Sequence, residues 1–236
     1  MKGSWFLCMV LALTLPSGRV SAQYYDQREY APSEARYISV GVLADDFSPL
    51  SSNPLPDSLA IRYNRIMPTI SFQQGSAELF FGYTRYTLSG ESKAAILVGG
   101  RYGAEVPIVG RWPSTLLLPL QLAADFTKAE GAGSSKDDFN IASIGVGTGL
   151  KYRYMSRSLE FSLGVMELAQ YSTEGIGVSN GFSAATLGDA ILLLRDVAVF
   201  DGMVIGYRFR LQTWSMSDPK FNYRAVSHGP YLGIMF

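Results

Sequence analysis

Two-residue alternation of apolar side chains is the feature that most constrains the fold of this chain. In residues 114–126, STLLLPLQLAADF, every second residue from Leu116 to Phe126 is apolar, and the pattern recurs in residues 140–154 and 202–212. A period of two places these side chains on one face of a β-strand. Runs of about ten residues exceed the usual five or six of soluble sheets and match a tilted membrane-spanning strand.

The sequence contains ten such segments, of which the eighth alternates least clearly. They begin near Tyr37, Ile61, Ala77, Lys93, Ser114, Phe139, Ser158, Phe182, Met203 and Val226. We therefore predict an all-β fold, namely a closed antiparallel up-and-down transmembrane β-barrel of about ten strands, with eight or twelve strands as the alternatives.

The connections between these segments differ in length. Long polar connections follow odd-numbered segments, as in residues 45–58 and 128–138, whereas tight ones such as 156–158 follow even-numbered segments. Residues 107–113 and 197–200, on the tight side, are longer than this rule predicts. Short turns on one side and long loops on the other are typical of outer-membrane barrels, so we expect the long loops to be extracellular.

Composition narrows the class of protein further. The chain has 20 Lys plus Arg and 20 Asp plus Glu, and this balance argues against a nucleic-acid partner, which would leave a basic footprint. Charged residues make up only 17% although 47% of the residues are hydrophobic. After the first residues no apolar run is long enough for a transmembrane helix, so the apolar residues must be hidden in another way.

The N-terminus has the pattern of a secretory signal. Lys2 precedes an apolar stretch over residues 5–15, and small residues stand before a cleavage position after Ala22. We predict a signal peptide over 1–22, a disordered periplasmic tail over 23–36 and the barrel over 37–236. The single cysteine, Cys8, lies in the predicted signal, so the mature chain would have neither disulfides nor cysteine–zinc sites.

A soluble barrel would also show alternation, with its apolar face inward. Here the less apolar face is mainly Gly, Ser, Thr and Ala with a few Arg, which suits a narrow interior better than a water-facing surface. The opposite face is aliphatic, and Tyr83, Tyr102, Tyr152 and Tyr154 are expected near its ends, where a membrane has its headgroups. These residue types favour a membrane barrel.

The alternation continues through Phe236, the last residue of the sequence. The segment YLGIMF resembles the terminal strand of the bacterial outer-membrane β-barrel superfamily, which ends in an aromatic residue after alternating apolar ones. The resemblance covers residues 37–236 and names no subfamily. It implies a location in the outer membrane of a Gram-negative-type bacterium, membrane lipid and the barrel-assembly machinery as partners, and an assembly signal at Tyr231, Leu232, Ile234 and Phe236.

Charged and amide side chains on the inward face form the candidate site. They are Glu78, Arg101, Glu105, Gln121, Asp125, Lys151, Arg153, Glu160, Arg208 and Arg210. Buried charges have to be paired, so we interpret these residues as a polar network that fills a narrow barrel. The alternative is a pore lining that selects small solutes.

His228 raises a catalytic alternative. It is expected near the outer end of the last strand, beside Asp45 and Asp46 of the first, and a histidine with nearby carboxylates can activate water. The omptin proteases are ten-stranded outer-membrane barrels with an Asp/His constellation at the outer rim. Alternation, however, puts His228 on the lipid face, and no other omptin pattern is present.

The predicted function is therefore a non-enzymatic outer-membrane barrel with a structural, adhesive or transport-related role. A small-solute channel is the second interpretation and an omptin-like protease the third. We expect no cofactor and no metal. A small solute or surface ligand, not identified by the sequence, is left open as a further partner.

Overall fold

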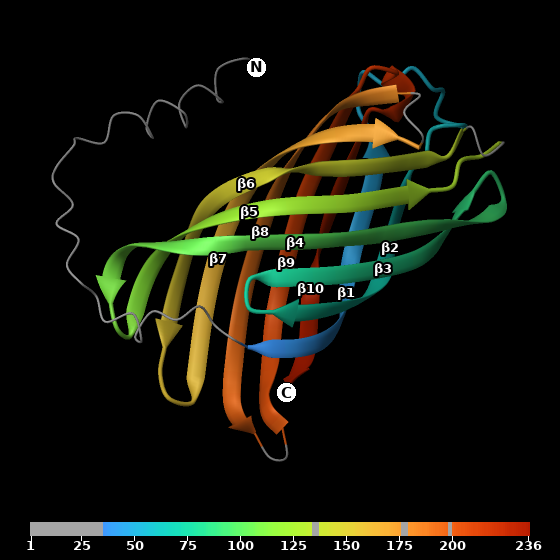
Figure 1. Ribbon diagram of the computed structural model, residues 1–236. Helices are drawn as coiled ribbons and strands as arrows, with labels where there is room; N and C mark the ends of the chain where they lie inside the picture. Colours follow the sequence, from blue (N-terminus) through green and yellow to red (C-terminus); the bar gives the residue numbers. More distant parts are fainter. Residues whose placement is uncertain (1–34, 134–136, 176–178, 198–199) are drawn as a thin grey trace, which may run out of the picture. The chain divides into compact units, whose positions relative to one another are not determined.

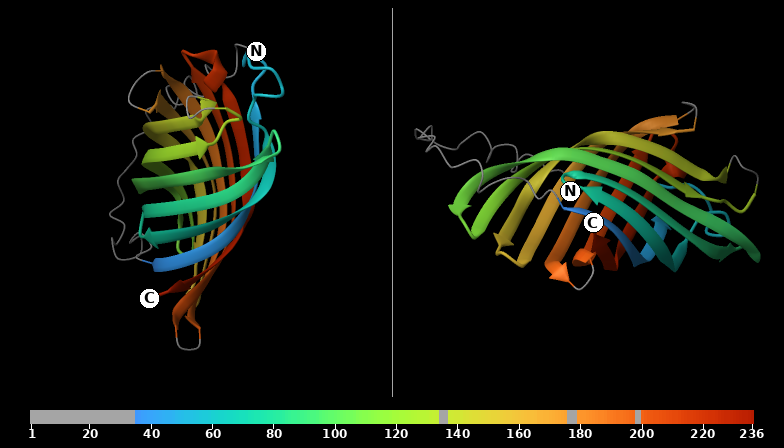
Figure 2. Two further views of the ribbon diagram at one scale, coloured as in Figure 1. Left: turned by 90° about the vertical axis from the view of Figure 1, so that its right-hand side faces the viewer. Right: turned by 60° about the horizontal axis from the view of Figure 1, so that its bottom comes forward.

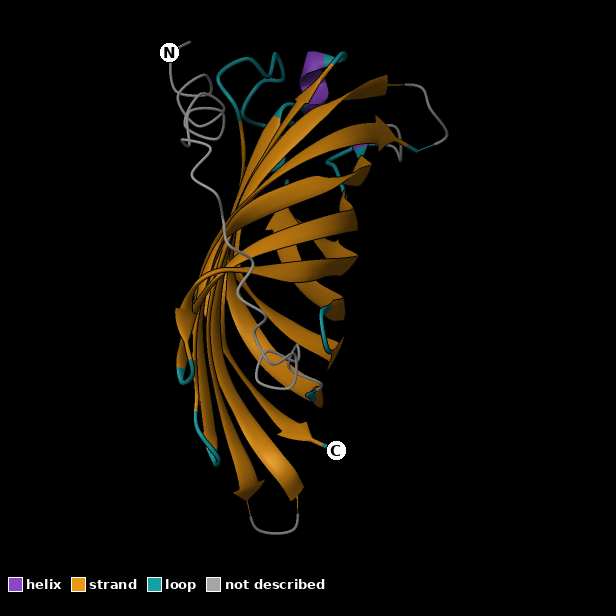
Figure 3. Cartoon of the chain, turned by 60° about the vertical axis from the view of Figure 1, so that its left-hand side comes forward, coloured by secondary structure: helices purple, strands orange, loops and turns teal. Residues whose placement is uncertain are grey.

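The computed structural model describes residues 35–133, 137–175, 179–197 and 200–236, nearly all in β-strands (Figures 1 and 3). The strands are β1 (Arg36–Pro49), β2 (Tyr63–Gln74), β3 (Ala77–Leu88), β4 (Glu91–Arg111), β5 (Ser114–Ala129), β6 (Phe139–Met155), β7 (Leu159–Glu174), β8 (Ser179–Val197), β9 (Phe200–Met216) and β10 (Tyr223–Met235). A 3-10 helix, η2 (Pro219–Phe221), precedes β10. Among the described residues no helix is long and apolar enough to cross a membrane.

The ten strands close into one antiparallel barrel, as predicted. Each strand pairs with its neighbours in sequence, and β1 closes the ring by pairing with both β2 and β10. Tyr37, for example, lies opposite Gln73 on one side and Met235 on the other. Figure 2 shows that the strands are strongly inclined to the barrel axis. The β4–β5 and β6–β7 hairpins extend farther than the β2–β3 turn.

Every strand begins within three residues of the predicted position. The two connections that looked too long are corrected, because β4 continues to Arg111 and β8 to Val197, so most of residues 107–113 is strand. β1 begins at Arg36, one residue before the predicted start of the barrel. The predicted signal peptide and residues 23–34 of the predicted tail lie outside the described residues.

Apolar side chains cover the outer surface of the wall. On β5, Leu120 and Leu122 are 46% and 59% exposed, whereas Ala123 and Asp125, which follow them on the opposite face, are buried. On β10, Leu232 and Ile234 point outward and alternate with buried residues. The alternation of exposed and buried residues therefore agrees with the outward and inward faces predicted from the sequence.

The interior differs from the prediction at the end where the long loops lie. Small residues do line the middle of the barrel, because a side chain at Gly206 would clash with the Tyr231 ring and one at Gly99 with the Phe80 ring. At the loop end, however, the interior is a cluster of large buried side chains, among them Phe47 and Trp214. The inward face is therefore apolar and aromatic at one end and polar at the other.

Candidate functional site

Ten polar side chains that the sequence predicts inside the barrel lie on its inward face. They are Glu78, Arg101, Glu105, Gln121, Asp125, Lys151, Arg153, Glu160, Arg208 and Arg210. The structure divides them between two groups near the tight turns and a layer deeper in the barrel. Strand alternation alone places them there, since each occupies an inward position of its strand.

Glu78 on β3 is the centre of the first group. Its carboxylate accepts hydrogen bonds from Arg101 on neighbouring β4, with Arg101 Nε 2.9 Å away, and from Arg208 on β9. Strands β2, β1 and β10 separate β3 from β9 in the ring, so the bond from Arg208 crosses the interior. Because the Glu78 side chain is only 4% exposed, its charge depends on these two guanidinium groups.

The second group is a chain of alternating charges over β4, β6, β7 and β8. Glu105 accepts hydrogen bonds from Lys151 Nζ at 3.0 Å and from Arg153. Arg153 Nε lies 3.3 Å from Glu160 Oε1, and the other oxygen of Glu160 accepts a hydrogen bond from Arg195 at 3.2 Å. Each carboxylate contacts two cations, so the group links strands without leaving a buried acid unpaired.

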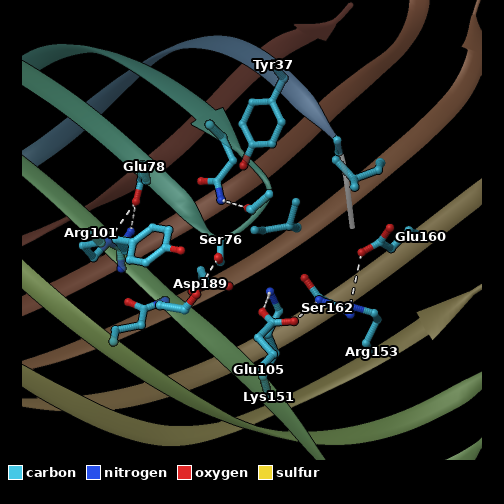
Figure 4. A pocket seen from close by; sticks show the side chains of 18 of the residues that line it. Tyr37, Ser76, Glu78, Arg101, Glu105, Lys151, Arg153, Glu160, Ser162 and Asp189 are labelled. Carbon is cyan, nitrogen blue, oxygen red and sulfur yellow. Dashed lines mark hydrogen bonds and ion pairs between the residues drawn. The ribbon is translucent and has the colours of Figure 1, made fainter. Parts of the chain in front are cut away.

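A cavity of about 380 Å³ lies among these two groups (Figure 4). Figure 4 shows Glu78 with Arg101 on one side of it and Arg153 with Glu160 on the other. The Ser76 hydroxyl donates a hydrogen bond of 2.6 Å to the Gly103 carbonyl and holds the β2–β3 turn against β4 at the cavity rim. The size and charged lining suit a small polar solute.

Deeper in the barrel, Asp125 on β5 organises a layer of amides. It pairs with Arg210 at 3.1 Å and accepts a hydrogen bond of 2.7 Å from Gln170 Nε2. Gln212 Nε2 donates to Gln170 Oε1 at 3.1 Å. These side chains come from β5, β7 and β9, so the layer extends across the interior.

Aromatic rings fill the loop end of the interior. The Phe47 ring on β1 lies 5.1 Å from that of Phe139 on β6, 4.9 Å from that of Tyr223 and 5.4 Å from that of Tyr63, centre to centre. Phe139 in turn lies 5.1 Å from Trp214. Strands β1 and β6 are on opposite sides of the ring, so side chains from opposite walls are in contact. All five are at most 6% exposed.

The structure does not assemble the Asp/His constellation of the omptin-like alternative. His228 faces outward, where its Nδ1 lies 2.6 Å from the Tyr207 hydroxyl. Asp45 points inward and is 5% exposed, whereas Asp46 points outward. His228 and Asp45 therefore lie on opposite faces of the wall. Within the described ranges, no three His, Cys, Asp or Glu side chains are grouped so that they could hold a metal ion.

Several interior residues were not predicted. Asp189 on β8 lines the cavity, and its Oδ2 has no hydrogen-bond partner in the described part of the chain. Apolar and polar residues alternate poorly in β8, so the sequence did not show that Asp189 points inward. Gln170 and Gln212 were not included in the predicted polar network, although alternation places both on the inward face.

Comparison with known proteins identifies no close relative. No protein-family model and no curated protein matches the chain. Among solved structures, the outer membrane protease OmpT of Escherichia coli has a TM-score of 0.35 and 10% identity, covering 87% of this chain and 98% of its own. The attachment invasion locus protein Ail of Yersinia pestis has a TM-score of 0.22 and 10% identity, with coverages of 86% and 99%.

The toluene transporter TodX of Pseudomonas putida has a TM-score of 0.27 and 9% identity, covering 88% of this chain and 90% of its own. These three proteins are a protease, an attachment protein and a transporter, and at this level of similarity none of their activities transfers to this chain. The description of the barrel rests on its own ten strands and their register.

Proposed function

We propose that this chain is a non-enzymatic barrel of the bacterial outer membrane, closed to solutes, with a structural or adhesive role. The aliphatic outer surface supports a position in lipid, because side chains such as Leu122, Ile144 and Leu163 are more than half exposed in the isolated chain. A closed barrel also leaves no sheet edge whose backbone N–H and C=O groups lack partners. The hydrocarbon core of a membrane requires this, because it contains no water to bond them.

The contact between Phe47 and Phe139 is the observation that carries the closed-lumen proposal. These rings come from opposite walls, and with Tyr223 and Trp214 they form a buried cluster. A packed aromatic layer has no room for a hydrated solute. Below it, the Asp125 layer and the bond from Arg208 to Glu78 also cross the interior.

The direct test is conductance. Purified protein refolded into planar bilayers should give no discrete current steps under applied voltage, although gel mobility before and after heating shows that it is folded. Stable current steps from the folded protein would contradict the closed lumen and favour the channel interpretation.

The cavity is the observation that favours the binding of a small polar ligand as the second candidate. It holds about 380 Å³ among charged groups near the tight turns. Without a path through the aromatic cluster, a solute in this cavity would enter and leave from the same end. The cavity thus suits binding better than passage.

The long loops are proposed to be extracellular. The ends of β1, β5 and β9 at which the connections over residues 50–62, 130–138 and 217–222 begin all lie on one side of the barrel, opposite the turns at 75–76 and 156–158. Protease added to intact cells should therefore cleave within residues 129–138 and spare residues 156–158. Cleavage at the first site only after the outer membrane is opened would indicate the reverse orientation.

Phe236 is proposed to act in assembly as well as in lipid contact. Its side chain is 55% exposed beside the ring of Phe72, at 6.4 Å, and burial of one ring in lipid contributes only about 1.5–3 kcal/mol. Deletion of Phe236 should therefore reduce the amount of assembled barrel far more than the stability of the fraction that does assemble. Wild-type levels of heat-modifiable protein in the deletion mutant would show that Phe236 is no assembly signal.

A further inference from the structure

Glu167 is a carboxylic acid in the middle of the apolar outer surface. It lies near the centre of β7 and points outward between Val165 and Ala169. Outward aromatic side chains stand on both sides of it along the strand, Phe161 toward the tight turns and Tyr171 toward the loops. Aromatic residues mark the two headgroup levels of a membrane barrel, so Glu167 lies about midway between them.

Other outward charges have a different position. Asp46, Arg85, Lys128 and Arg224 lie within four residues of the loop ends of their strands, where headgroups or water can solvate them. Glu167 has seven or more residues of strand on each side. An ionisable side chain at this depth is costly in lipid and marks a functional contact by default.

The hydrogen bonds around Glu167 are incomplete in a single chain. Its Oε1 accepts a hydrogen bond of 2.8 Å from the Thr186 hydroxyl on β8. On the other side it lies opposite Thr148 of β6, which also points outward. No side-chain hydrogen bond involves Thr148 or the second oxygen of Glu167 within the described residues. Hydrocarbon offers neither group a substitute for water.

Several small side chains lie near Glu167 on the outer wall. Its outward neighbours on β7 and β8 include Ala169, Ala184, Gly188 and Ala190, whereas the outward face of β5 carries leucine at four consecutive outward positions, 116 to 122. Small side chains let two transmembrane surfaces approach closely enough for polar groups to bond across the contact. Small side chains on β7 and β8 therefore lie next to the unsatisfied polar groups.

We propose that this β6–β8 surface is an intramembrane interface with a second copy of the same chain. The row Thr148, Glu167, Thr186 carries an acceptor with a donor on each side, so the surface complements itself when it is turned by a two-fold rotation. In such a contact residue i meets residue j and j meets i. Glu167 of one protomer accepts the hydrogen bond of the partner's Thr148, and the reverse contact satisfies the other pair.

This interface rests on the proposed membrane location, and the test separates the two. Protein lacking the predicted signal is labelled with donor or acceptor fluorophores and refolded into phosphatidylcholine vesicles at decreasing protein-to-lipid ratios. Energy transfer should persist on dilution for wild type. Glu167→Leu and Thr148→Val should each shift the half-maximal ratio at least tenfold toward more protein. Thr213→Val, an outward threonine on β9, should leave it unchanged.

A cysteine-crosslinking arm identifies the surface. Ala169→Cys, two residues from Glu167 on the outward face of β7 and therefore close to the two-fold axis, should form an intermolecular disulfide in the vesicles, whereas Val40→Cys, on β1, should not. Barrels that insert, as judged by heat-modifiable mobility, but show no energy transfer at any ratio would overturn the interface alone. Unaltered dimerisation in both Glu167→Leu and Thr148→Val would also overturn it. A chain that fails to insert would overturn the membrane proposal, and the interface with it.

Discussion

Replacing Glu78 with glutamine is expected to lower the free energy of unfolding by about 3–5 kcal/mol. The carboxylate is nearly inaccessible and holds the guanidinium groups of Arg101 and Arg208 from two different walls. Glutamine keeps the shape but removes the carboxylate that these two largely buried guanidinium groups share. Urea titration of the refolded barrel in lipid vesicles measures the loss.

Glu91→Gln is the matched control. Glu91 also pairs with a cation, Lys93, but its side chain is 67% exposed, so water screens the interaction and the unfolding transition should change little. Equal midpoints for Glu78→Gln and wild type would mean that the interior pairs carry no net stability.

Replacing Phe139 with alanine should cost a similar amount, about 3–5 kcal/mol, because it opens a cavity that rigid strands cannot close. The side chain is 0% exposed and its ring contacts Phe47, Trp214 and Tyr223. Denaturant titration followed by tryptophan fluorescence in a Trp112→Phe background, which leaves Trp214 as the one tryptophan from residue 23 onward, reports both stability and the loss of the ring contact.

Phe182→Ala provides the comparison for Phe139→Ala. Phe182 is 71% exposed on the outer wall, and lipid chains can fill the space that its ring leaves. Its replacement should therefore be less costly. A loss at Phe182 as large as that at Phe139 would contradict the packed aromatic layer that closes the lumen.

Strand number, strand order and the two faces of the wall could be predicted from the sequence because one constraint governs all of them. A strand with lipid on one side and a filled interior on the other must alternate, and a register shift of one residue would turn every side chain around. Where both faces are apolar, as in residues 182–194 of β8, alternation fades, and Asp189 was missed.

The contacts across the interior could not be predicted in the same way. Alternation tells that Glu78 and Arg208 point inward, but their heights depend on the stagger of strands accumulated around the ring. The same holds for Phe47 and Phe139, whose inward direction is clear from sequence but whose meeting is not. Bulges add to this, since β4 shifts register between Pro107 and Val109.

Glu167 was overlooked for a different reason. The outer face was identified from its many aliphatic residues, and a single acidic residue in one strand does not change that pattern. Its significance appears only when β6 and β8 are aligned beside β7, so that Thr148 and Thr186 stand opposite it.

A spin-label scan of β5 in lipid vesicles tests the central claim, that the alternating outer face lies in lipid. The only native cysteine, Cys8, lies in the predicted signal, so single cysteines at Leu120, Gln121, Leu122 and Ala123 can be labelled selectively in the chain from residue 23 onward. Oxygen concentrates in hydrocarbon, whereas a nickel chelate stays in water. Frequent oxygen collisions and rare nickel collisions are expected at 120 and 122, and few of either at 121 and 123. Nickel collisions that exceed oxygen collisions at 120 and 122 would place that face in water and contradict the membrane barrel.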